Sequence, residues 1–232
     1  MSGLTSRRAL IAAGLGLMAT GALSACASTS RVLSEASGLT LQHFDDETPG
    51  ASVAVAVVGD SLSVGVVEQV TGVEASGRWA AAYQTGIVRL IGGWSKVGAD
   101  TATMARSAAP VTGADALLIM AGTNDLPSNV SFDESADNLE AIVSAVGLDK
   151  VIVAQIPPLI RHLDDVVEYN RQLVALATDR GWGSCDPWQR MREADGSWNT
   201  EYYGDGTHPN SAGYALAATE LYDALVAQLW GS

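Results

Sequence analysis

The stretch Ala54–Ser63, AVAVVGDSLS, decides the fold of this chain and locates its chemistry. Its first five residues are apolar, which is typical of a strand buried on both faces of a sheet. The run stops at a glycine, a carboxylate and a hydroxyl, and apolar residues with helical spacing follow over residues 62–70. In parallel sheets, ligands bind outside the carboxyl ends of the strands. We therefore expect Asp60 and Ser61 to lie where a substrate binds.

Strand-like and helix-like segments alternate along the rest of the chain. Apolar runs predict strands at residues 53–58, 87–91, 116–121, 151–155 and 182–185. Amphipathic spacing and cap residues predict helices at residues 62–70, 100–109, 131–146, 164–180 and 211–230. Buried strands between amphipathic helices favour an α/β fold, a three-layer α/β/α sandwich with a mainly parallel five-stranded sheet.

Composition divides the chain into three segments. Residues 1–25 are expected to form a signal peptide, because the positive charges of Arg7 and Arg8 precede an apolar run. Residues 26–50 are rich in Ser, Thr, Gly and acids, which predicts a tether, and residues 51–232 are expected to form the folded domain. An uncleaved anchor helix is the alternative for the first segment.

The end of the signal segment indicates where the protein is expected to reside. Leu23–Cys26, LSAC, resembles the lipobox of bacterial lipoproteins, which implies that Cys26 is lipidated and becomes the first residue of the mature chain. The protein is then exported and held by its lipid at the outer face of the bacterial cell membrane. Arg7 and Arg8 after Ser6 also resemble a twin-arginine export signal, and a general secretion signal is the alternative.

Charge restricts the classes of partner. The net charge is −13, whereas nucleic acids and anionic lipid surfaces bind Lys- and Arg-rich proteins. We expect no nucleic-acid binding and no membrane contact other than the lipid anchor. No cysteine spacing of a metal site occurs in the sequence, and the expected chemistry needs no metal or organic cofactor.

Polar residues follow several of the predicted strands. Asp60 and Ser61 follow the first strand of the domain, and Gly122–Asp125 (GTND) follow the third. Gly98 lies in the loop after the second strand, and Tyr203–Asn210 (YGDGTHPN) precede the last helix. Because parallel strands end at one edge of the sheet, we expect these loops to converge there.

The residue types in these loops suit acyl transfer. A serine hydroxyl such as that of Ser61 is a poor nucleophile without a general base. Asp205, three residues before His208, can meet the Nδ1 side of that ring and leave Nε2 to take the serine proton. The backbone N–H groups of Ser61 and Gly98 and the side-chain amide of Asn124 would form a three-donor oxyanion hole.

These blocks resemble those of the GDSL/SGNH hydrolase superfamily, in the same order. They are GDSLS at residues 59–63, a glycine at 98, GTND at residues 122–125 and DGTHPN at residues 205–210. The resemblance covers about residues 51–230 and implies a flavodoxin-like fold.

The resemblance also implies a role for each matching residue. It makes Ser61 the nucleophile and the first oxyanion donor. Gly98 and Asn124 become the other two oxyanion donors, and Asp205 and His208 complete the catalytic triad.

Other residues in these blocks have competing interpretations. Gly92 and Gly93 compete with Gly98 for the oxyanion position, and Gly98 is preferred because the GADT that it begins resembles the continuation found in the family. We expect Asp60 to accept hydrogen bonds from loop N–H groups, and Asp125 to support its loop rather than carry protons.

The roles of several aromatic and histidine side chains stay open at this point. His162 either starts a helix in solvent or lies at the mouth of the site. Five aromatic side chains in or near these loops either contact substrate or pack under loops; they are Trp94, Trp188, Trp198, Tyr202 and Tyr203.

The expected function is that of a serine esterase that hydrolyses carboxylic esters through an acyl-enzyme. We expect short acyl or acetyl esters of lipids or glycans at the cell envelope, because the sequence shows no long apolar lid. One alternative is an acyltransferase that moves the acyl group to a sugar acceptor. Another is a non-catalytic envelope binding module that retains the fold.

Overall fold

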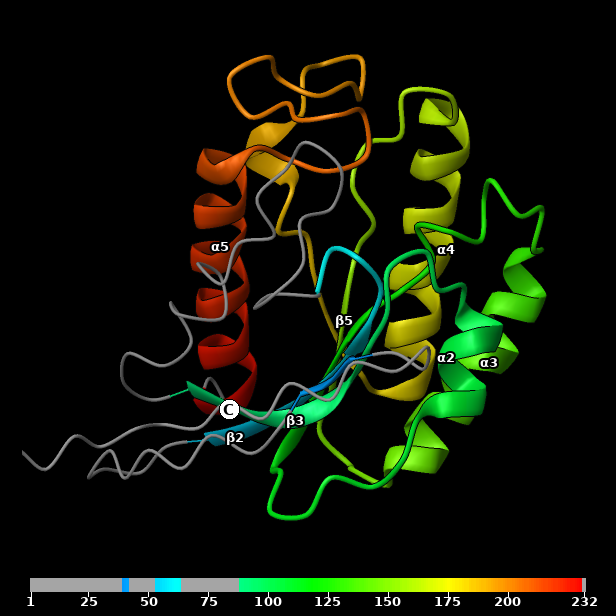
Figure 1. Ribbon diagram of the computed structural model, residues 1–232, viewed down its shortest axis with the longest axis vertical. Helices are drawn as coiled ribbons and strands as arrows, with labels where there is room; N and C mark the ends of the chain where they lie inside the picture. The colour runs from blue at the N-terminus through cyan, green and yellow to red at the C-terminus, as the bar shows by residue number, and fades with distance from the viewer. Residues whose placement is uncertain (1–38, 42–52, 64–87, 231–232) are drawn as a thin grey trace, which may run out of the picture. The chain divides into compact units, whose positions relative to one another are not determined.

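The computed structural model describes residues 39–41, 53–63 and 88–230. The predicted helix over residues 62–70, the predicted signal peptide and Cys26 therefore lie largely or wholly outside the described residues. Within them, the chain forms a sheet with helices on both faces (Figure 1).

In the described part of the chain the sheet has six strands, in the order β1-β3-β2-β4-β5-β6. Strands β2 to β6 are parallel, and only β1 runs antiparallel, against β3. Their bounds are β1 Leu39–Leu41, β2 Val53–Gly59, β3 Val88–Ser95, β4 Ala116–Met120, β5 Val151–Ala154 and β6 Gly183–Cys185. The five predicted parallel strands and the α/β fold class are confirmed. Strand β1 was not predicted, because it lies in the segment assigned to a tether.

Strand β3 is longer than predicted. The sequence predicts a loop from Gly92, but pairing with β2 continues through Gly93 and Trp94 to Ser95. A Cβ on Gly93 would lie 1.8 Å from the carbonyl oxygen of Val57, so only glycine fits this close approach of the two strands. Gly92 and Gly93 are therefore residues of the strand.

The helices begin and end close to where their cap residues predict. They are α2 Thr101–Ser107, α3 Phe132–Val146, α4 Leu163–Arg180 and α5 Ser211–Trp230, with a short 3-10 helix, η1 Gln189–Met191. Asp100 caps α2 by accepting a hydrogen bond of 2.7 Å from the backbone N–H of Thr103. Ser131 and Glu134 form the predicted capping box of α3, and Gly181 ends α4 in the left-handed conformation.

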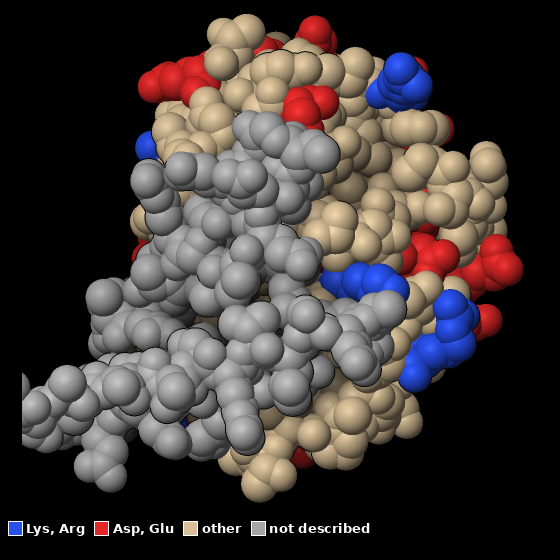
Figure 2. Space-filling view, viewed as in Figure 1, with Lys and Arg blue, Asp and Glu red and all other residues tan. Residues whose placement is uncertain are grey.

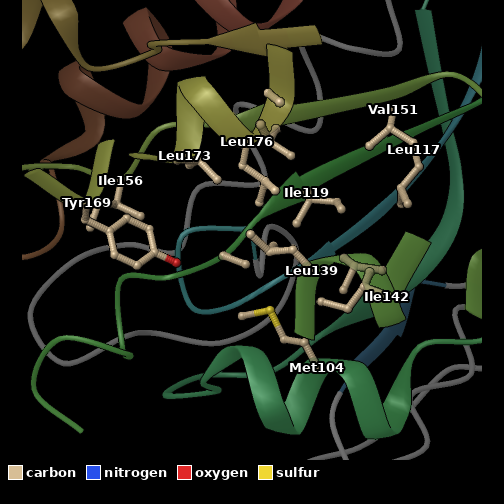
Figure 3. Packing of buried hydrophobic residues seen from close by; sticks show 14 of the residues in the cluster. Met104, Leu117, Ile119, Leu139, Ile142, Val151, Ile156, Tyr169, Leu173 and Leu176 are labelled. Carbon is tan, nitrogen blue, oxygen red and sulfur yellow. The ribbon is translucent and has the colours of Figure 1, made fainter. Parts of the chain in front are cut away.

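Alternate residues of each strand face opposite helix layers. Val55 and Val57 of β2 belong to the cluster that packs against α5, whereas Ala56 and Val58 belong to the cluster under α2, α3 and α4. Figure 3 shows the second cluster, which is built from side chains of the central strands and of α2, α3 and α4, with Met104 of α2 close to Leu139 of α3. None of the helices in the described part of the chain is long and apolar enough to cross a membrane.

The strand order also positions the site. The parallel strands, taken in chain order, lie in the order 2-1-3-4-5 of flavodoxin-like folds. The chain leaves β2 toward β3 on one side and later returns to β4 on the other, so the order reverses at β2. Ligands of such sheets bind at the carboxyl ends of the strands at this reversal, which is where Ser61 and Asn124 follow β2 and β4.

Candidate active site

The turn that carries Ser61 is held by its own polar groups. The Asp60 side chain accepts a hydrogen bond of 2.9 Å from the backbone N–H of Leu62, which closes a turn around the serine. The Ser63 hydroxyl donates to the Asp60 carbonyl at 3.0 Å. A Cβ on Gly59 would lie 2.2 Å from the Ser63 hydroxyl oxygen, so glycine is required where the strand ends. These contacts present Ser61 at the edge of the sheet.

Ser61, His208 and Asp205 meet, as predicted from the sequence. Ser61 Oγ lies 2.7 Å from His208 Nε2, although 147 residues separate them in the chain. His208 Nδ1 lies 2.9 Å from Asp205 Oδ2 and 3.1 Å from Oδ1. With an ionised Asp205, Nδ1 carries the ring proton and donates it to the carboxylate, which leaves Nε2 free to accept the serine proton.

Asp205 is held in the charged state that this arrangement needs. Burial acts to raise the pKa of its carboxyl, but hydrogen bonds from the backbone and ring of His208 and from the Thr207 N–H outweigh it. The net effect lowers the pKa below its ordinary value. The backbone bonds to Asp205 Oδ1 are 2.8 Å from His208 N and 3.1 Å from Thr207 N.

Two backbone N–H groups in the predicted site loops donate no hydrogen bond within the described part of the chain. Neither Ser61 N nor Gly98 N has a hydrogen-bond acceptor among the described residues. Lys96 N donates to the Gly59 carbonyl at 3.2 Å, which holds the turn that contains Gly98 beside the end of β2. Gly98 has a φ of +73° and an exposed backbone. Gly92 and Gly93 lie within β3, whereas Gly98 lies in the turn that follows the strand.

The Asn124 amide is more constrained than the sequence suggested. Its Nδ2 donates to the carbonyl oxygen of Ala99 at 2.9 Å and to Asp60 Oδ2 at 3.3 Å. Both amide hydrogens therefore have acceptors in the protein. For Asn124 to stabilise an oxyanion, the longer bond to Asp60 has to be shared or exchanged.

Asp125 supports its loop, as predicted from the sequence. Its carboxyl oxygens accept from the backbone N–H and the hydroxyl of Thr101 at 2.9 and 2.8 Å, and from the Ser135 hydroxyl. The loop also packs on α4, because a Cβ on Gly122 would lie 2.2 Å from the hydroxyl oxygen of Tyr169. Figure 3 shows this hydroxyl at the end of the buried cluster.

The remaining candidate residues pack within the fold or lie at the start of a helix. Trp188 and Trp198 are buried and meet edge to face at 6.2 Å, so they pack under the loop rather than contact substrate. His162 precedes α4, with Nδ1 3.0 Å from Asp165 Oδ2, which agrees with its predicted place at a helix start. Trp94 is a partly buried residue of β3.

Two residues that matter for the site were missed from sequence. Ile160 is 53% exposed, yet its backbone N–H donates to the Gly206 carbonyl at 3.3 Å and its side chain lies over that glycine of the His208 loop. Asn170 on the buried face of α4 binds both backbone polar groups of Ile156, at 2.8 and 3.0 Å, and so fixes the loop after β5. A polar residue on an otherwise apolar helix face was the signal available for Asn170.

The described residues contain no group of three or more His, Cys, Asp or Glu side chains placed to hold a metal ion. Among the described residues on the face shown in Figure 2, acidic and basic side chains are interspersed among uncharged ones.

Comparison with known proteins identifies the family. The model of the GDSL-like Lipase/Acylhydrolase family matches residues 57–216. The chain belongs to this family. Membership makes it an ester-hydrolysing enzyme, and the matched residues include the Ser61 turn, the Asn124 loop and the Asp205–His208 loop. No curated protein matches the chain significantly.

Solved structures share the family fold. A protein provisionally described as lipolytic, of the G-D-S-L family, from Desulfitobacterium hafniense aligns with a TM-score of 0.62 and 14% identity over 75% of this chain and 99% of its own. A GDSL-like lipase from Bacteroides thetaiotaomicron has a TM-score of 0.55 and 17% identity over 74% and 87%. A carbohydrate acetylesterase family member from Sinorhizobium meliloti has a TM-score of 0.55 and 17% identity over 76% and 99%. At these identities the likeness establishes the fold alone.

Proposed function

We propose that this esterase works through a Ser-His-Asp acyl-enzyme mechanism. The observation that carries the proposal is the continuous set of contacts from Ser61 Oγ through the ring of His208 to Asp205. Nε2 takes the serine proton as Oγ attacks the ester carbonyl, and Asp205 stabilises the imidazolium that forms. The same proton then passes to the leaving alkoxide, and water, activated by Nε2, releases the acid from the acyl-enzyme.

The developing oxyanion is stabilised by three donors in this proposal. They are the N–H groups of Ser61 and Gly98 and the side-chain amide of Asn124. Loss of one such donor costs about 10²–10³ in kcat in serine hydrolases.

The proposed substrates are short acyl or acetyl esters of lipids or glycans. The named acetylesterase among the structural neighbours supports this choice. Three of the exposed large apolar side chains, Val97, Ile160 and Tyr203, lie in or beside the loops of the site and offer a small apolar surface for such a group. Transfer of the acyl group to a sugar hydroxyl would use the same acyl-enzyme, and analysis of products formed with a glycan acceptor separates the two reactions.

A fluorophosphonate probe tests the mechanism. It should label the wild-type protein covalently, and Ser61→Ala should abolish labelling and ester hydrolysis. Ser144→Ala, at an exposed serine of α3, is the matched control and should label normally. Failure of the folded wild-type protein to react would instead favour a non-catalytic binding module.

We also propose that Cys26 carries a lipid that holds the protein at the outer face of the bacterial cell membrane. The LSAC stretch and the apolar segment before it support this proposal. Radiolabelled palmitate should enter the wild-type protein and not Cys26→Ala, with Cys185→Ala as the control. Equal labelling of both variants would contradict the proposal.

A further inference from the structure

The Asp60 carboxylate lies between two parts of the candidate oxyanion hole. It is fully buried, and its two oxygens accept from different donors. Oδ1 accepts from the backbone N–H of Leu62 at 2.9 Å, which fixes the peptide that follows Ser61. Oδ2 accepts from Asn124 Nδ2 at 3.3 Å. One side chain thus connects the nucleophile turn after β2 to the amide after β4.

Only an ionised carboxylate fits both donors without competition. A carboxylate has two accepting oxygens, whereas a carboxamide has one oxygen and an NH₂ group that only donates. In the carboxamide, the Leu62 N–H or the Asn124 amide faces a donor instead of an acceptor, and a buried unpaired donor is costly. A protonated carboxyl keeps lone pairs on both oxygens, but its hydroxyl oxygen accepts more weakly than a carboxylate oxygen and holds the Asn124 amide less firmly.

The contact to Asn124 also has the length expected of a bond that exchanges. At 3.3 Å it is weaker than the 2.9 Å bond from the same nitrogen to the Ala99 carbonyl. The stronger bond fixes the position of Nδ2, and the weaker one holds its second hydrogen until an oxyanion competes for it.

We propose that Asp60 is a positioning residue that, as a carboxylate, holds the Asn124 amide ready to donate to the oxyanion. The inference rests on the proposed acyl-enzyme mechanism and adds a member to its machinery. Asp60 touches no reacting atom in this scheme, because its charge acts on the reaction through the Asn124 amide.

The charge of Asp60 should then enter the pH dependence of the reaction. Burial, opposed by the Leu62 hydrogen bond, raises the pKa of this carboxyl to about 7, and the negative charge of Asp125 adds to the effect. Tyr169 of α4 and Tyr214 of α5 also face Asp60, and its charge contributes to raising the pKa of each phenol. Activity therefore requires the loss of two protons as pH rises, one from Asp60 and one from the imidazolium of the triad.

The test compares wild type with Asp60→Asn on a soluble acetyl ester between pH 4.5 and 9. In the wild type, log(kcat/KM) should fall with a slope that approaches 2 on the acid side, because two groups must be deprotonated. In Asp60→Asn the slope should be 1. At pH 8.5, kcat should be lower by about 10- to 100-fold with KM nearly unchanged, because a misplaced oxyanion donor affects the transition state alone.

Asn124→Ala provides a second variant, in case Asp60→Asn does not fold. Without the amide, the charge of Asp60 no longer has a donor to position, so the acid limb should again have a slope of 1. The inference is overturned by a slope of 1 in the wild type, by a slope of 2 in a folded variant, or by an Asp60→Asn enzyme with wild-type kcat. A protein that hydrolyses no ester and reacts with no fluorophosphonate would refute the proposed mechanism itself, which is a separate outcome.

Discussion

Replacing Asp60 by asparagine should stabilise the protein at alkaline pH. The pKa of this carboxyl is about 7 in the folded protein against an ordinary value of 3.8. Well below pH 3.8 the side chain is protonated in both the folded and the unfolded chain. As pH rises from 4 to 7, the unfolded chain loses the proton and the folded one keeps it, so this carboxyl lowers the free energy of unfolding progressively.

The size of the effect follows from the same two values. A difference of about 3 pKa units corresponds to about 4 kcal/mol at 1.36 kcal/mol per unit. Asparagine does not titrate, but it leaves one buried donor unpaired, which costs about 1–3 kcal/mol at every pH. We therefore expect the free energy of unfolding of Asp60→Asn, relative to that of the wild type, to rise by about 4 kcal/mol between pH 4 and pH 8. For a protein of this size, this pH-dependent change corresponds to about 10 °C in Tm.

Urea and thermal denaturation of both proteins at pH 4, 6 and 8 would measure the difference. Asp137→Asn, at an exposed carboxylate of α3, controls for the change in net charge and should show no such pH trend. An Asp60→Asn protein that is less stable than the wild type at pH 8, or a difference that does not change with pH, would refute the reasoning. If the prediction holds, the buried Asp60 carboxylate lowers the stability of the protein while it supports activity.

Three further predictions concern the loops of the site. Gly122→Ala should destabilise the protein by several kcal/mol and lower kcat, because φ is +109° and the new Cβ would lie 2.2 Å from a buried tyrosine hydroxyl. The control, Gly147→Ala, has φ +74° and open space around it, and should cost only about 1 kcal/mol. Urea denaturation measures both. Ile160→Ala should reduce kcat/KM for butyryl esters more than for acetyl esters. The control, Val167→Ala at an exposed valine of α4, should leave kcat/KM for both esters unchanged. Equal effects of Ile160→Ala on the two esters would exclude Ile160 from acyl contact. Asp205→Asn should lower kcat by about 10⁴, because the amide can donate to Nδ1 and favour the wrong tautomer, and a loss below tenfold would contradict the assigned role.

Local signals explain why so much of the fold could be predicted. Asp100, Ser131 and Gly181 cap their helices through residues within one helical turn of their own position. Their capping roles can therefore be predicted from the sequence. The apolar runs of the five parallel strands are equally local, because burial on both faces requires nearly every residue to be apolar. The convergence of Ser61 and His208 then followed from the rule that parallel strands end at one edge.

The parts that escaped prediction depend on contacts between distant segments. Gly92–Ser95 have the composition of a turn, but pairing with β2 extends the strand through them. The Leu-Thr-Leu of β1 is too short to show a period and is defined by its partner. The Asn124 amide donates to Ala99 and Asp60 because three loops meet there. Contacts between loops that are distant in the chain cannot be predicted from a local sequence pattern.

Strand β1 matters to anyone who shortens the protein for expression. Leu39–Leu41 pair with Gly93–Ser95 and cover the outer edge of β3. A recombinant version that begins at residue 51 would leave that backbone edge open to pairing with other molecules, which promotes aggregation. Truncations meant for crystallisation should therefore start upstream of Leu39.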